Sequence, residues 1–133
     1  MSTLVTEKNS AALQRRAFRG LIISIGLAAA GAVYEMFSHG VFSFFMLYAF
    51  AVPLVFGVTL YLVLLFLGKY PDRVFLNLWN SAIAAFSAGC VFQGVLEIYG
   101  TTNSLIIVYP IAGCVLAASA LVSPAIRTLR KVR

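Results

Sequence analysis

Four long apolar stretches, separated by short polar segments, dominate the chain. They cover residues 20–37, 41–67, 74–98 and 104–126. A helix needs about 20 apolar residues to cross the ~30 Å hydrocarbon core of a bilayer, and inside lipid the backbone must satisfy its own hydrogen bonds. The pattern therefore predicts an all-α fold, an integral membrane four-helix bundle that forms a single transmembrane domain over residues 1–133.

The remaining segments are short and polar. Residues 1–19 are basic, and Ser10 is a candidate N-cap for a helix that runs into the first stretch. Pro71 lies in the polar turn after the second stretch and is expected to end the preceding helix. Residues 30–32 resemble a signal-peptide cleavage site, but three more apolar stretches follow, so we expect the first helix to remain uncleaved. A basic tail occupies residues 127–133.

The composition agrees with a membrane protein. Hydrophobic residues make up 62% of the 133 residues and charged residues only 11%, against about 25% charged in soluble domains. No segment is long enough to form a separate soluble domain. Cys90 and Cys114 both fall within apolar stretches, where thiols pack as small apolar groups, so we expect no disulfide.

The positions of lysine and arginine predict the orientation. All ten lie in residues 1–19, 68–73 or 127–133, and the turns at 38–40 and 100–103 contain none. By the positive-inside rule, this distribution places both termini in the cytoplasm (N-in/C-in) of a multi-pass protein of the cell membrane. Basic ends also attract anionic lipid headgroups, so membrane lipids are expected partners. No nucleic-acid motif accompanies the charges, and we predict no nucleic-acid binding.

The two halves of the chain resemble each other weakly. Residues 31–37 can be aligned with 93–99, which pairs Glu35 with Glu97. Each half then holds a helix with a glutamate near its outer end, a tight turn and a returning helix, as in two tandem parallel hairpins. Any two helical hairpins share an apolar composition, so chance similarity is the alternative.

These glutamates belong to the main candidate site. Glu35 and His39 are four residues apart, as are Gln93 and Glu97, so each pair shares one face if its helix continues that far. Packing of the first helix on the third would bring all four together. Three interpretations remain open: simple helix ends in the headgroup region, a polar network between helices, or a cation, proton or metal site. The identity of any metal is unknown, because no closed ligand motif is present.

Other polar and helix-breaking residues have ordinary explanations. Asn77, Asn80 and Ser81 in the third stretch suit hydrogen bonds between helices, with the lining of a transport path as the alternative. Pro53 and Pro110, each followed by a glycine, predict kinks in the second and fourth helices.

No catalytic or cofactor-binding motif is present in the sequence. We therefore expect neither an enzyme nor a cofactor. The leading hypothesis is a small transporter or channel-like protein for a cation, proton or small solute, with a polar mouth at Glu35, His39, Gln93 and Glu97. The alternative is a non-catalytic accessory or regulatory subunit of a larger membrane complex. In either case we expect a homo-oligomer or an assembly with another membrane protein.

Overall fold

The computed structural model describes the backbone of residues 2–132. The side chains of the predicted basic tail, residues 127–133, lie outside the described part of the chain. The described residues form an all-helical protein with four segments long and apolar enough to cross a membrane. In chain order the elements are α1 (Ser2–Phe37), α2 (Phe44–Tyr48), η1 (Pro53–Val58), α3 (Thr59–Phe66), α4 (Arg73–Ile98), η2 (Ser104–Ile107) and α5 (Val108–Val132).

The first helix is longer than the apolar stretch that predicts it. α1 is continuous from Ser2, so the basic N-terminal segment belongs to the same helix as the first membrane segment. Ser10 therefore lies inside α1 rather than at its start, and its hydroxyl donates to the Glu7 carbonyl oxygen over 2.8 Å. The expectation that Ser10 caps a helix is wrong, because the helix already has a preceding turn.

The second apolar stretch is broken, as its proline predicts. Pro53 has no N–H and stands at the start of η1, a π-helical segment in which the Thr59 N–H reaches back to the Leu54 carbonyl oxygen. Ahead of it, Ser43 caps the short helix α2. Pro110 has a milder role, since it lies in the first turn of α5, where a missing N–H removes no bond within the helix.

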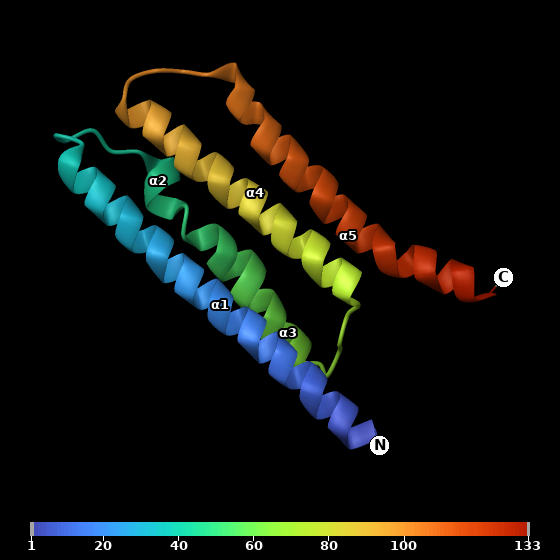
Figure 1. Ribbon diagram of the computed structural model, residues 1–133. Coiled ribbons are helices and arrows are strands. Elements are labelled where there is room, and N and C mark those ends of the chain that lie inside the picture. The colour runs from blue at the N-terminus through green and yellow to red at the C-terminus, as the bar shows by residue number, and fades with distance from the viewer. Residues whose placement is uncertain (1, 133) are drawn as a thin grey trace.

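The four membrane segments lie in a row (Figure 1). α1 packs on α2, η1 and α3, these pack on α4 or on each other, and α4 packs on α5. Among the described residues, α1 has no Cα atom within 8 Å of α4 or α5. Both termini lie at the same end of the molecule, together with the connection between α3 and α4 (Figure 1).

Glycines allow the closest helix contacts. A Cβ on Gly94 would lie 2.7 Å from the Met46 Cβ, and one on Gly31 would lie 3.0 Å from the Met46 carbonyl oxygen. α2 is thus wedged between the parts of α1 and α4 that lie farthest from the termini. A Cβ on Gly89 would likewise lie 2.8 Å from the Tyr109 Cβ, so α4 and α5 are also in close contact.

Candidate functional site

Glu97 is held by side chains at the end of α4 opposite the termini. The Ser43 hydroxyl donates to its Oε2 over 2.7 Å, and Gln93 Nε2 donates to its Oε1 over 3.2 Å. Ser43 is only 1% exposed, and its Oγ also accepts the backbone N–H of Met46 over 3.3 Å. Glu97 therefore links α4 to the segment that leads into α2. These hydrogen bonds form a polar network between helices.

Glu35 lies in a different environment. Its Oε1 is buried and has no hydrogen-bond partner among the described residues. Leaving a buried polar atom unsatisfied costs about 1–3 kcal/mol, and more when the atom is charged. This oxygen can accept a proton or a hydrogen bond from a group that enters the site.

His39 does not share a helical face with Glu35, because the first helix does not continue as far as residue 39. α1 ends at Phe37, and His39 follows in the left-handed region with φ of 54°. The imidazole is exposed and lines a hollow of about 320 Å³ together with Tyr34 and Tyr99. A four-residue spacing places two side chains together only inside a continuous helix.

Of the four predicted residues, the structure links two by a hydrogen bond. Gln93 and Glu97 share a hydrogen bond, and within the described part of the chain no hydrogen bond links this pair to Glu35 or His39. The reason is the wedge of α2, which lies against both α1 and α4. Within residues 2–132, no three His, Cys, Asp or Glu side chains gather as metal ligands.

A second polar network lies toward the end with the termini. Arg16 of α1 donates to the Asn77 Oδ1 over 3.5 Å and also hydrogen-bonds the Tyr61 hydroxyl of α3. Tyr61 is 1% exposed and donates to the Asn80 Oδ1 of α4. The prediction that Asn77 and Asn80 form hydrogen bonds between helices is confirmed, whereas Ser81 is exposed.

Arg16, Tyr61 and Ser43 also belong to these polar networks, although the sequence pattern did not indicate them as site residues. Tyr61 carries the clearest signal, because it is a hydrogen-bonding side chain within a stretch of leucine and valine. Buried tyrosine hydroxyls usually find a partner. Arg16 was assigned only to orientation, and its partner Asn77 is 61 residues away in sequence.

A cavity of about 310 Å³ adjoins this network, and we call it the central cavity. It lies between α1, the η1–α3 segment and α4. Ser87 lines it, is 8% exposed, and has a buried Oγ without a hydrogen-bond partner among the described residues. The lining residues are Arg16, Arg19, Gly20, Ile23, Pro53, Gly57, Tyr61, Asn80, Ile83, Ala84 and Ser87.

The cavity combines a cationic end with a mostly apolar interior that contains one unsatisfied hydroxyl. Arg16 and Arg19 lie at one end, and Ser87 lies two to three helical turns along α4 from Asn77. Such a lining can hydrogen-bond water or a small polar solute.

Comparison of the chain with protein-family models, curated proteins and solved structures finds no match.

Proposed function

We propose that the chain is a small transporter or channel-like protein of the cell membrane, with both termini in the cytoplasm. Its solute path begins in the central cavity, and the wedge of α2 closes that path toward the outer side. The confinement of all lysines and arginines to the termini and the α3–α4 connection supports this orientation. We also propose that the row comprises two parallel hairpins, α1 with the second membrane segment and α4 with α5.

The observation that carries the transport proposal is the Ser87 hydroxyl. Ser87 lies 14 residues beyond Arg73, the first residue of α4, which corresponds to about 21 Å along the helix. At that depth in a bilayer there is no lipid group to satisfy a hydroxyl. An unpartnered Oγ that lines a cavity with an arginine end supports entry of water or solute from the cytoplasmic side.

The glutamates take a new role in this proposal. Glu97 holds the segment before α2 through Ser43, and Met46 of α2 fills the space between Gly31 and Gly94. Release of the Ser43–Glu97 bond would free the wedge and open the path outward. The outer residues thus serve as a gate rather than as the solute-binding mouth.

The charges at the cavity favour a small anion over a cation. Arg16 and Arg19 both line it, and no acidic residue does. Unlike charges attract and like charges repel strongly where water is scarce. The proposed solute therefore differs from the cation or proton that the outer glutamates suggest.

Osmotic swelling of proteoliposomes tests this function. Chloride and nitrate serve as probes, with valinomycin present so that potassium follows, and swelling is read by light scattering. Ser87→Leu fills the cavity and should reduce swelling to the rate of protein-free liposomes. The matched control is Ser119→Leu, since Ser119 is exposed on α5 and bonds only its own helix over 2.7 Å.

Equal swelling with Ser87→Leu and wild type would remove the central cavity from the mechanism. A second measurement does not depend on the choice of solute. In a chain with Cys90→Ala and Cys114→Ala, a Ser87→Cys thiol should react with a membrane-impermeant thiol reagent from the cytoplasmic side only. Reaction from neither side would contradict an open inner path.

The row of helices favours a second candidate, an accessory subunit of a membrane complex. α5 packs on α4 and η2 but on no other described element, so most of its circumference is uncovered by this chain. A partner helix could cover it. This role predicts that the protein purified in mild detergent carries another membrane protein with it, and recovery of the lone chain would count against it.

A further inference from the structure

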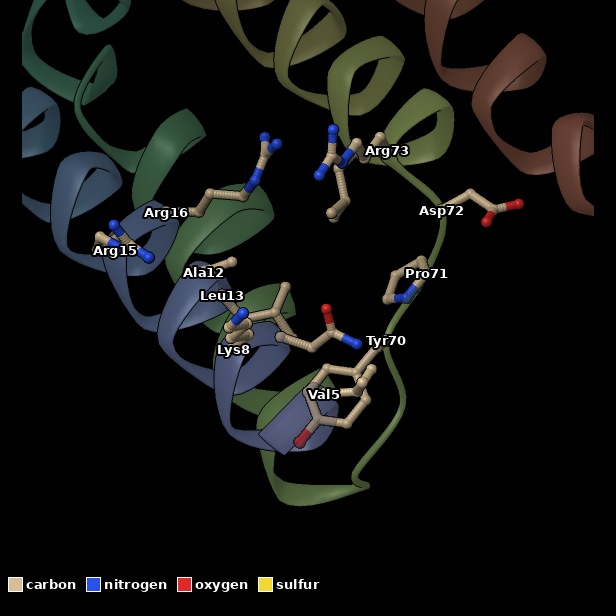
Figure 2. Close-up of a pocket in the computed structure, with 12 residues that line it drawn as sticks. Val5, Lys8, Ala12, Leu13, Arg15, Arg16, Tyr70, Pro71, Asp72 and Arg73 are labelled. Carbon is tan, nitrogen blue, oxygen red and sulfur yellow. The ribbon is translucent and has the colours of Figure 1, made fainter. Parts of the chain in front are cut away.

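Another hollow, of about 690 Å³, lies at the end of the molecule that holds both termini (Figure 2). The start of α1, the α3–α4 connection and the start of α4 form its walls. We call it the inner basic pocket. Its lining residues are Val5, Lys8, Asn9, Ala12, Leu13, Arg15, Arg16, Tyr70, Pro71, Asp72, Arg73 and Leu76.

The charges of this pocket are mostly positive and face inward. Figure 2 shows the guanidinium groups of Arg16 and Arg73 directed toward each other across the hollow, while the carboxylate of Asp72 points away from it. Lys8 adds a further positive charge from α1. α4 begins at this pocket with Arg73, and the positive end of its helix dipole adds to the same field.

The rest of the wall is apolar. Leu13 and Leu76 are 2% and 7% exposed and belong to a buried cluster with Ala17 and Tyr61. Tyr70 and Val5 close the lower side in Figure 2. The pocket therefore joins a cationic rim to an apolar floor, at the level where the basic segment of α1 meets its apolar part.

We propose that the inner basic pocket binds one anionic phospholipid, whose phosphate faces Arg16 and Arg73. Guanidinium groups bind phosphate oxygens through paired, charge-assisted hydrogen bonds. The apolar floor suits the upper part of an acyl chain, which a free phosphate lacks. The pocket shares Arg16 with the central cavity, but Lys8 and Arg73 line only the pocket, so the test of this proposal does not depend on transport.

Titration of the purified protein in neutral detergent, followed by native mass spectrometry, tests the proposal. Phosphatidylglycerol should bind as a single tight copy, and phosphatidylcholine should bind more weakly. Arg73→Gln and Lys8→Gln should each weaken phosphatidylglycerol binding about fivefold, as expected from about 1 kcal/mol per basic residue. Lys69→Gln is the matched control, since it removes one charge from the same connection at a residue that does not line the pocket.

Four outcomes would overturn the proposal. Equal binding of the two lipids would show no anionic preference, and equal weakening by Lys69→Gln would reduce the effect to general surface charge. Displacement of phosphatidylglycerol by an equal concentration of inorganic phosphate would identify a free-anion site. If Arg73→Gln fails to fold, Lys8→Gln, at an exposed position of α1, gives the decisive comparison. If Arg73→Gln or Lys8→Gln removes a dimer peak but leaves lipid binding unchanged, the pocket is instead a contact with a second copy of the chain.

Discussion

Two glycines determine how closely the wedge of α2 approaches the long helices. Gly94→Ala should destabilise the protein, because its Cβ would lie 2.7 Å from the Met46 Cβ and 2.9 Å from the Met46 backbone nitrogen. Overpacking of this kind costs about 1–3 kcal/mol. Thermal unfolding in detergent, followed by Trp79 fluorescence, measures the loss.

Gly26→Ala is the control for this substitution. Gly26 also lies within a long helix, but no atom lies within 4 Å of its added Cβ. Alanine is the better helix former by about 1 kcal/mol, so this variant should unfold at the same or a higher temperature. An equal loss of stability in both variants would mean that the contact with Met46 is not the cause.

The role of a single residue could be predicted from the sequence where that role did not depend on which residue is its partner. Asn77 and Asn80 are polar residues in an apolar helix, and hydrogen bonding between helices follows from that alone. Their partners Arg16 and Tyr61 come from distant parts of the chain. Glu97 was identified as a site residue, but its bond to Ser43 depends on where the chain turns, which the sequence pattern does not specify.

The short helix α2 depends on Ser43 at its start. Ser43→Ala would remove both the bond to Glu97 and the acceptor for the Met46 N–H. Losing an N-cap costs about 1 kcal/mol, and a buried hydrogen bond to a charged group costs about 1.5–3 kcal/mol. The unfolding temperature in detergent should fall, and Glu97→Gln should cause a smaller fall because an amide oxygen still accepts from Ser43.

Ser119→Ala provides the comparison for the anchor of α2. Its hydroxyl is exposed and bonds only the Val115 carbonyl oxygen of the same helix. This variant should unfold within about 0.5 kcal/mol of the wild type, as surface substitutions do. A Ser43→Ala protein as stable as Ser119→Ala would contradict the anchoring role of Ser43.

The existence and type of the membrane elements followed directly from the sequence, whereas their internal breaks followed only in part. Each apolar stretch is long enough to require a helix. Residues 41–67 are apolar on all sides, so their pattern cannot show where one helical turn ends and another begins. Pro53 marked one break because it lacks an N–H. The start of α2 depends on the Ser43 cap and was not predicted.

At the scale of the whole molecule, orientation is the property most open to test. A fluorescent protein fused to either terminus should fluoresce, because both ends are proposed to lie in the cytoplasm, where it folds. Alkaline phosphatase inserted after Gly100, in the turn between α4 and η2, should be active because that turn is proposed to lie outside. Active phosphatase at either terminus would reverse or reject the proposed topology.

The order of the helices in the row could not be predicted from the sequence. Apolar helices share the same composition on most faces, and lipid offers no hydrophobic preference among them. The first and third helices meet through Arg16 and Asn77, but at Gly31 and Gly94 the wedge of α2 lies between them.

The arrangement of the helices in a row affects how the chain inserts into the membrane and folds. Among the described residues, close backbone packing joins only membrane segments that are consecutive along the chain. Each helix that leaves the ribosome therefore finds its partner already in the membrane and need not wait for a later one. Proteins with mostly local contacts fold fastest, because little chain entropy is lost before contacts form. Membrane insertion and folding of this protein can thus proceed in the same order, one helix after another.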